Sequence, residues 1–274
     1  MAAGKDRMAP WRARAPGWTA TAPETVSTND RHNQRLIAAA AIAPAMRVLD
    51  LASGAGEPAV SIALRVGAAG FVAATDLVVE MMAGARRRAA ALDLAQLRFA
   101  VADMEALPYA SASFDAATCR FGIMFPADPV AAAAEARRVL RPGARAAYLV
   151  HGPAEHNDQF ETTRAAIAAF FGTAPDGSSA GRYRFAGEGA LAAMLRAAGY
   201  RDVTETAFDE VTEVDAGQGF WRSQLDRNRE PRVVALDGAG RAALERAVAQ
   251  AFDRFRTDEV YRLRSFVRLG AGVS

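Results

Sequence analysis

The sequence is poor in the residues on which disulfide-bonded, metal-binding or membrane-spanning proteins depend. Cys119 is the only cysteine, which excludes an intramolecular disulfide and a thiolate metal cluster and favours a reducing cytoplasm. Lys5 is the only lysine, so a lysine Schiff base in the core is excluded. The alanine-rich stretch 36–43 is far shorter than the roughly 20 apolar residues that a membrane helix requires. We therefore expect a cytoplasmic protein with no membrane partner.

An excess of charge of one sign is also lacking. The 33 basic residues nearly balance the 31 acidic ones, without long runs of either, so no nucleic-acid partner is indicated. The 274 residues are 51% hydrophobic and can bury a large core. We expect a single domain over 30–274, preceded by a flexible segment or lid over 1–29. Trp11 and Trp18 in that segment are costly to expose, and Trp18 is a candidate substrate contact.

Residues 48–59, Val-Leu-Asp-Leu-Ala-Ser-Gly-Ala-Gly-Glu-Pro-Ala, run from a short apolar strand through a glycine-rich turn into a helix. Gly54 and Gly56 lack Cβ, so the backbone there can adopt positive φ and approach a ligand closely. Pro58 suits the first turn of the helix, where no amide donor is needed. The pattern predicts a nucleotide-cofactor site. It also fits a dinucleotide fingerprint, so this motif alone does not separate a nicotinamide enzyme from other cofactor users.

Acidic residues end the first three predicted strands. Asp50 closes the first, Asp76 the second, and Asp103 followed by Met104 the third. Because parallel strands end at one edge of the sheet, these carboxylates should gather there. Asp76 can accept both ribose hydroxyls of an adenosine, whereas Asp50 suits a cationic ligand better than a pyrophosphate. Capping of nearby backbone amides would explain the position of any one of these acids. It explains less well why all three strands end in an acid.

Four segments carry a resemblance to a known family: VLDLASGAGEPA, ATDLVVEMMAGAR, ADMEALPYASASFDAATCRFGIMF and EARRVLRPGARAAYLV. Over residues 30–152 the chain resembles the class I S-adenosylmethionine-dependent methyltransferases, particularly small-molecule enzymes of the ubiquinone/menaquinone-methyltransferase type. The resemblance implies an α/β fold with a Rossmann-like, doubly wound, mostly parallel sheet and an antiparallel hairpin at its C-terminal edge. It also implies S-adenosyl-L-methionine as the cofactor and S-adenosyl-L-homocysteine as the product.

The resemblance also assigns cofactor contacts to individual positions of this chain. Ala52 is one departure, because many members carry the first glycine of the turn there. The implied contacts are the turn formed by Asp50, Ala52, Ser53, Gly54 and Gly56 for the methionine part, Asp76 and Leu77 for the ribose, and Asp103 and Met104 for the adenine.

The rest of the pattern alternates strands and helices, which predicts a parallel sheet covered on both faces. Beyond residue 152 we expect helical insertions around 153–199 and 216–230 that cover a substrate, and strands over 203–214 and 260–269 that form the edge hairpin. The earlier elements are expected as helices at 30–43, 57–66, 79–92 and 128–140 and strands at 47–51, 70–75, 97–102, 114–120 and 144–150.

Methyl transfer from a sulfonium requires alignment of the acceptor with the S–CH₃ bond, and a hydroxyl acceptor must also lose its proton. His151 follows a predicted strand at the carboxyl edge and is our leading candidate for the base, with His156 as the second. Each could instead be a loop histidine that bonds to nearby backbone. With only Glu155 and Asp158 nearby as further ligands, we predict no metal.

Side chains after the fourth predicted strand and in residues 217–229 are candidates for lining an acceptor pocket. A row of aromatic and methionine side chains more often packs in the hydrophobic core, however. Arg120 is expected to pack against the cofactor or hold an acidic acceptor. The fourth strand lacks the Asn/Asp-Pro-Pro-Tyr/Phe pattern expected of nucleic-acid and protein-amide methyltransferases. This favours O- or C-methylation of a small, fairly apolar acceptor such as a secondary metabolite. The candidate acceptor contacts are Phe121, Met124, Phe125, Phe220 and Trp221, together with Trp18.

Other functions stay open at this point. One is an S-adenosylmethionine-binding enzyme of the same fold that catalyses cyclisation or a pericyclic rearrangement. Another is a non-catalytic methyltransferase-like subunit. A nicotinamide dehydrogenase is disfavoured by Asp50 and by Asp103-Met104. We expect a monomer or homodimer acting on a small molecule, with no nucleic acid.

Overall fold

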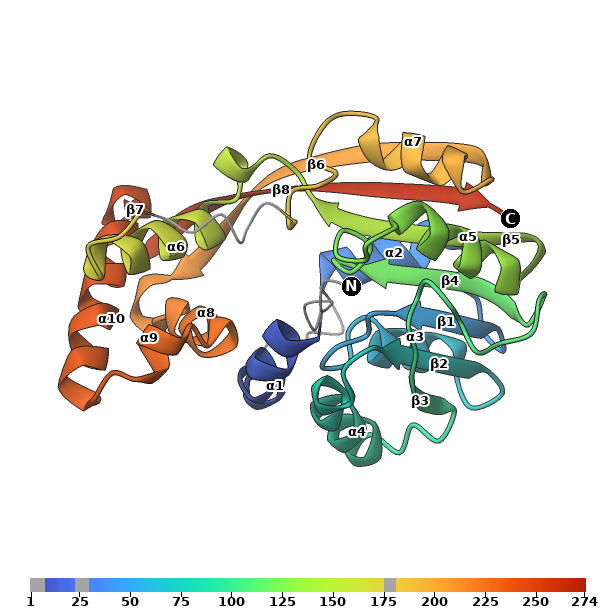
Figure 1. The fold of residues 1–274 in the computed structure, drawn as a ribbon, viewed down its shortest axis with the longest axis horizontal. Coiled ribbons are helices and arrows are strands. Elements are labelled where there is room, and N and C mark those ends of the chain that lie inside the picture. Colours follow the sequence, from blue (N-terminus) through green and yellow to red (C-terminus); the bar gives the residue numbers. More distant parts are fainter. Residues whose placement is uncertain (1–7, 23–29, 175–180) are drawn as a thin grey trace, which may run out of the picture.

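The computed structural model describes residues 8–22, 30–174 and 181–274. An eight-stranded mixed sheet runs through it in the order β3-β2-β1-β4-β5-β8-β6, with β7 paired to β8 (Figure 1). The strands from β3 to β5 are parallel, and β8 runs antiparallel to its neighbours. This confirms the mostly parallel α/β sheet with an antiparallel edge hairpin. The strands are β1 (Arg47–Leu51), β2 (Phe71–Asp76), β3 (Leu97–Val101), β4 (Phe114–Arg120), β5 (Leu140–His151), β6 (Arg201–Asp215), β7 (Arg256–Thr257) and β8 (Val260–Val273).

Alternate residues of the central strands pack on opposite faces of the sheet. Leu49 and Tyr148 belong to the hydrophobic cluster on one face, and Val48 and Leu149 to the cluster on the other. Both faces are therefore buried, as a parallel sheet requires. Helices α5 (Pro129–Val139) and α7 (Ala190–Ala197) cover the first face, and α2 (Arg31–Ala39), α3 (Ala59–Val66) and α4 (Met82–Ala91) contribute to the second.

Two aspartates start the helices that begin near the carboxyl ends of the strands. The Asp30 carboxylate accepts a hydrogen bond from the His32 amide at 2.8 Å and caps α2. Asp128 accepts from the Ala131 amide at 2.9 Å, and Pro129 occupies the first turn of α5. These caps fix where the chain enters each helix, and the first also fixes the direction in which His32 leaves the backbone.

The hairpin of β6 and β8 is longer than the parallel strands. β8 pairs with β5 only over Val267–Val273, while its pairing with β6 continues to Val260. The remaining length projects beyond the parallel sheet (Figure 1). It packs against a group of helices that we call the cap: α6 (Asp158–Phe170), α8 (Trp221–Asn228), α9 (Pro231–Val234) and α10 (Gly238–Phe252).

Within the segment expected to be flexible or a lid, residues 9–21 form helix α1 (Ala9–Thr21). Residues 1–7 and 23–29 lie outside the described part. Gly17 explains the close packing of α1 against α8, because a Cβ built there would lie 1.9 Å from the carbonyl oxygen of Asp226. On its other side, Ala15 contacts Val78 and Met81. The helix therefore bridges the cap and the α/β sheet.

The insertion expected around 153–199 divides into two parts with different positions. Helix α6 belongs to the cap, but α7 packs on the sheet through Leu191 and Leu195. These two leucines are four residues apart and fully buried, so one face of α7 is committed to the core. Among the described residues, no helix is both long and apolar enough to cross a bilayer.

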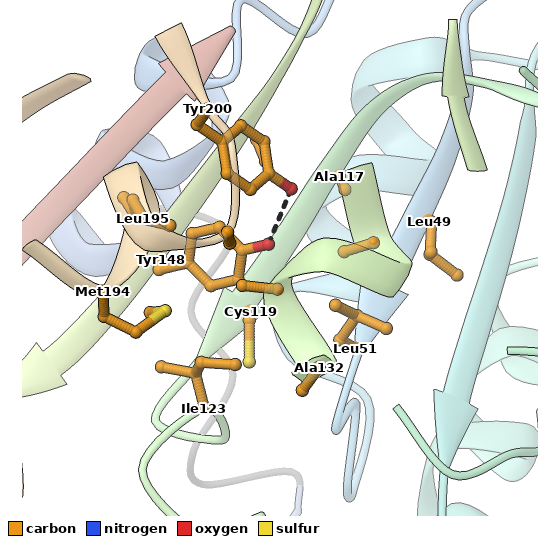
Figure 2. Packing of buried hydrophobic residues seen from close by; sticks show 14 of the residues in the cluster. Leu49, Leu51, Ala117, Cys119, Ile123, Ala132, Tyr148, Met194, Leu195 and Tyr200 are labelled. Carbon is orange, nitrogen blue, oxygen red and sulfur yellow. Dashed lines mark hydrogen bonds between the residues drawn. The ribbon is translucent and has the colours of Figure 1, made fainter. Parts of the chain in front are cut away.

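A pair of tyrosines is buried in the cluster between the sheet and α7. The hydroxyl groups of Tyr148 and Tyr200 lie 3.0 Å apart and share a hydrogen bond (Figure 2). Tyr148 is fully buried and Tyr200 is 4% exposed. Each hydroxyl thus supplies the polar partner that the other needs away from water.

We predict that Tyr148→Phe and Tyr200→Phe each lower the free energy of unfolding by about 1–3 kcal/mol, because each leaves one buried hydroxyl unpaired. The double variant should lose clearly less than the sum of the two. Urea unfolding of all four proteins measures this coupling. Strict additivity of the two losses would mean that the hydroxyl pair does not form.

Candidate functional site

A cavity of about 420 Å³ lies at the carboxyl edge of the parallel strands. One wall consists of the turns that follow β1 to β5, and α1 supplies a second wall through Trp11, Arg14 and Trp18. The remaining wall comes from the cap and the chain near it. Its members are Gln159, Phe160, Arg182, Gln224, Arg227 and Ser265.

The Asp76 carboxylate connects the turns after β1 and β2. Its Oδ2 accepts from the Gly54 amide at 2.9 Å, and its Oδ1 accepts from the Val78 amide at 2.9 Å. Burial raises the pKa of this carboxyl, and the backbone amides oppose the rise. Gly54 adopts φ +51°, which favours glycine. Asp76, Leu77 and Gly54 all line the cavity, as the sequence analysis expects of cofactor contacts.

Asp50 lies behind the cavity wall, which corrects its expected place around a ligand. Its side chain is completely buried, and Thr118 donates to Oδ1 at 2.6 Å. The hydroxyls of Ser53 and Thr75 bond to its backbone carbonyl, and these two residues face the cavity instead. Its other oxygen, Oδ2, is buried without a partner. Burial raises the pKa of Asp50 to about 7.

Gly56 is also displaced from its expected role. A Cβ built on it would lie 2.9 Å from the Ala85 Cβ and 3.2 Å from Arg88 Nη1, and its φ is +111°. This glycine therefore serves the packing of the turn against α4, and it is absent from the cavity lining. Asp103 and Met104 do line the cavity, and Asp103 accepts from the Glu105 amide at 3.0 Å.

Ala52 stands in the left-handed region with φ +53°, a conformation that is costly for a residue with a Cβ. Its methyl group fits because Gly122 lies opposite. A Cβ on Gly122 would be only 2.5 Å from the Ala52 Cβ and 2.8 Å from Cys119 Sγ. Phe121, next to Gly122, also has a positive φ of +55°. Strained backbone thus gathers where the turns after β1 and β4 meet.

His151 lies in the cavity wall, in agreement with the sequence analysis. Its ring stacks on Phe121 with centroids 4.2 Å apart and a 6° interplanar angle, and Phe160 contacts it edge-on. Arg182 Nη1 lies 3.4 Å from Nε2, and because a guanidinium only donates, Nε2 is the unprotonated nitrogen. Burial, with help from Arg182, lowers the pKa of His151 well below its usual value. The ring is therefore neutral at pH 7.

His32 is a second histidine in the cavity wall, and the sequence analysis assigned it no role. It contacts the ring of Phe121 edge-on, at 5.8 Å between centroids. Burial, followed by the charge of Arg120, lowers its pKa to about 4. The only local signal in the sequence is Asp30, which caps the helix that carries His32. The residues that His32 contacts come from distant strands, so the sequence does not reveal its place in the site.

Arg120 is held at the cavity edge by the start of α2. It donates to Asp30 Oδ2 and Asn33 Oδ1, both at 2.7 Å. It lines the cavity beside Phe121, but two of its nitrogens are already engaged. This arrangement favours packing against a cofactor over capture of an acidic acceptor, which were the two expectations for it.

The expected acceptor contacts divide between cavity and core. Trp18, Phe121 and Phe125 line the cavity, and Trp11 contacts Phe125 at 4.8 Å between ring centroids. The remaining expected residues are absent from the cavity lining and lie in other packing. Met124 is 1% exposed in the sheet core, Phe220 and Trp221 pack with Phe252 and Tyr261 in the cap, and His156 packs against Phe266.

Segment 217–229, a candidate for the acceptor pocket, contributes Gln224 and Arg227 to the cavity lining instead of the expected Phe220 and Trp221. On α8, Trp221 and Leu225 share the face that packs into the cap, while Gln224 and Arg227 line the cavity. The polar residues at helical spacing were the available signal. No group of three or more His, Cys, Asp or Glu side chains suited to a metal occurs in the ranges that the structure describes.

The strand order, the glycine turn and the strand-end carboxylates match the class I S-adenosylmethionine-dependent methyltransferase fold that the sequence resembles. Residues 48–143 match the family described as "Methyltransferase domain". The chain therefore carries a methyltransferase domain, and S-adenosylmethionine is the cofactor of its class.

Three known proteins illustrate the similarity. An uncharacterised protein of Mycobacterium tuberculosis is 43% identical over 108 residues, which cover 39% of this chain and 38% of that protein. Demethylmenaquinone methyltransferase of Deinococcus radiodurans is 42% identical over 125 residues, covering 45% of this chain and 51% of that enzyme. The structure of the 4+2 cyclase SpnF has a TM-score of 0.62 at 18% identity, covering 99% of this chain and 97% of the cyclase. The chain thus spans about half or less of the length of these two curated relatives.

We predict that Gly122→Ala lowers the free energy of unfolding by about 1–3 kcal/mol, because the new Cβ collides with Ala52. Ala52→Gly alone should raise it by about 0.5–1 kcal/mol through relief of the left-handed strain. In the Gly122→Ala background, Ala52→Gly should stabilise more than it does in the wild type. Denaturant unfolding measures all four proteins, and equal effects in both backgrounds would contradict the contact.

We predict that the contribution of His32 to stability falls as the pH drops from about 6.5 towards about 4, while the raised pKa of Asp50 acts in the opposite direction. In this pH window His32 is protonated in the unfolded chain but stays neutral in the folded chain. Proton binding at His32 therefore favours the unfolded state as the pH falls. His32→Gln should weaken this acid response, and above pH 7 its offset from the wild type should stay constant. Urea midpoints between pH 4.5 and 8 test this, and parallel curves across the whole range would refute it.

Proposed function

We propose that the protein transfers a methyl group from S-adenosylmethionine to a small, fairly apolar acceptor, by O- or C-methylation. The observation that carries the proposal is the continuity of the cavity. At one end it reaches the glycine turn with Asp76 and Asp103, and elsewhere it is lined by Trp11, Phe121 and Phe160. A cofactor and an acceptor can thus meet in one enclosed space.

The residues at the strand ends fit the cofactor. Gly54 leaves room for close approach, since a Cβ there would have no neighbour nearer than 3.8 Å. Asp76 is oriented for ribose hydroxyls by two amides, and Asp103 with Met104 is placed for the adenine. Oδ2 of Asp50 is buried without a partner behind the turn, and a bound sulfonium would favour the ionised form of this carboxyl, whose pKa burial raises to about 7. When bound, the sulfonium supplies an electrophilic methyl group.

The aromatic walls align an acceptor and exclude water, which supplies much of the catalysis of a displacement reaction. Trp11 and Trp18 of α1 lie over the cavity, and the cap faces them from α8. We therefore assign α1 and the cap as the cover of the acceptor site. Gly17 on α1 lets the two close tightly against each other.

His151 is the best placed group to take a proton from a hydroxyl acceptor. It is neutral, faces the cavity and is fixed by the stack on Phe121. A positioned base typically contributes about 10²–10⁴-fold to the rate. His156 lacks access to the cavity, so we no longer assign it a catalytic role.

The relatives support a small-molecule acceptor, since several are named as methyltransferases of quinone biosynthesis. A secondary metabolite fits the apolar walls equally well. The buried free thiol of Cys119 is consistent with a cytoplasmic location. We propose a monomer or homodimer that acts on this acceptor without nucleic acid.

A second candidate function is cyclisation or a pericyclic reaction without methyl transfer. The likeness of the fold to the 4+2 cyclase SpnF motivates it. The two functions differ in one observable, because a cyclase leaves the methyl group on the cofactor. The neutral His151 and the aligned cofactor turn favour methyl transfer.

We predict that S-adenosylhomocysteine binds with micromolar affinity in a calorimetric titration and that NADH does not bind. Asp76→Ala should weaken the binding at least tenfold, because the carboxylate both contacts the ribose and holds Gly54 and Val78 in place. Glu188→Ala removes an exposed carboxylate remote from the cavity and should bind as the wild type does. Binding of NADH instead, or of neither ligand, would overturn the proposed function.

A further inference from the structure

Arg182 is a cavity-lining cation that forms no ion pair with a carboxylate in the described part of the chain, and the charge of Glu161 acts on it only from a longer distance. Its contacts there are the Nε2 atom of His151 at 3.4 Å and the ring of Phe160, 4.4 Å from the guanidinium carbon. Burial lowers the pKa of Arg182 and the charge of Arg14 acts in the same direction, while Tyr183 and Glu161 oppose them. A half-buried guanidinium without an ion-pair partner leaves hydrogen-bond donors that an anionic ligand can satisfy.

Neighbouring charges are already satisfied within the protein. Glu161, on α6, accepts from the Tyr183 hydroxyl at 2.9 Å and forms an ion pair with Arg164. Arg120 is paired with Asp30. Arg182 therefore differs from Arg120, which shares the cavity wall but has its own carboxylate.

The acidic and basic side chains that line the cavity come from different parts of its wall. The carboxylates of Asp76 and Asp103 follow β2 and β3, where the cofactor is expected. Arg14 comes from α1, and Arg182 and Arg227 come from the cap side. Three arginines thus line the side of the cavity assigned to the acceptor, together with its aromatic walls.

We infer that the acceptor of this enzyme carries an acidic group, a carboxylate or a comparable delocalised oxyanion, which Arg182 binds beside His151. The inference rests on the proposed function and narrows its substrate class from a fairly apolar molecule to a flat, apolar acid. Arginine suits this task, because its planar fork donates two parallel hydrogen bonds to a carboxylate.

The same geometry places the reacting group. Nε2 of His151 lies 3.4 Å from Arg182, so an acidic group that draws the guanidinium onto itself frees Nε2 to accept from a hydroxyl next to that group. Phe121 and Phe160 flank His151 with their rings and can enclose a flat molecule. An aromatic or enolic acid with an adjacent hydroxyl matches all of these contacts.

The test compares acids with their neutral amides. The protein saturated with S-adenosylhomocysteine is titrated with 1-hydroxy-2-naphthoate, salicylate and 4-hydroxybenzoate, and with the carboxamide of each. We expect at least one acid to bind about tenfold or more tightly than its amide, as for a hydrogen bond to a charged group. Arg182→Gln should abolish this preference, and Arg182→Lys should retain part of it.

Arg184→Gln is the matched control, because Arg184 lies two residues away, outside the cavity lining, and also carries a positive charge. It should keep the acid preference, and circular dichroism checks that each variant folds. Equal binding of acids and amides by the wild type, including no binding of any, overturns the inference. A preference that survives Arg182→Gln also overturns it.

Binding of S-adenosylhomocysteine separates this inference from the proposed function. It should be the same in the wild type and in Arg182→Gln. The acids and amides are also titrated without S-adenosylhomocysteine. Failure of the cofactor analogue to bind therefore counts against the proposed function, while loss of the acid preference alone counts against the role of Arg182.

Discussion

The site depends on one carboxylate that joins two strand-end turns. Asp76 accepts the amides of Gly54 and Val78, so the turn after β1 and the turn after β2 have a fixed relative position. Without it, two largely buried amides would lose their acceptor, at a cost of about 1–3 kcal/mol each. The strained conformations at Ala52 and Gly54 are held in the same turn. The proposed ribose contact and the local stability of the turns thus rest on the same residue.

The electrostatic organisation follows from this arrangement. Carboxylates occupy the strand ends near the turn, and arginines from α1 and the cap occupy the opposite side. Between them, the lowered pKa values of His32 and His151 keep both imidazoles neutral at pH 7. A neutral imidazole can accept a proton, and its Nε2 atom in His151 is the unprotonated one. This division of charge is what the proposed cationic cofactor and the inferred acidic acceptor would need.

Sequence predicted the parallel half of the fold well, because its signals are local. Each strand there is short and apolar and ends in a turn signal, and the strand-end acids follow from the same pattern. The edge hairpin was anticipated, but not the length by which β6 and β8 extend beyond the sheet to meet the cap. That extension depends on the packing of Trp221 and Phe252 against Tyr261. These residues belong to different elements of the chain, so local sequence patterns do not predict their contact.

The errors at the site have a common physical origin. Phe220, Trp221 and Met124 are apolar enough for either a pocket or a core, and only tertiary packing decides between them. Arg182 and His32 were not predicted as site residues, because each is placed in the site by a contact with a residue far away in the sequence. These contacts are with His151 and Phe121, respectively. Asp50 was expected at the cavity surface but lies one residue layer behind it. Ser53 and Thr75, which bond to its backbone carbonyl, line the cavity instead.

A crystal structure of the complex with S-adenosylhomocysteine tests the central claim most directly. The account predicts the ribose hydroxyls on Asp76, the adenine beside Asp103 and Met104, and the amino-acid part along Ala52 to Gly54. The sulfur should then face the part of the cavity lined by Phe121 and His151. A ligand bound elsewhere, or in the reverse orientation with its adenine against α1, would contradict the account.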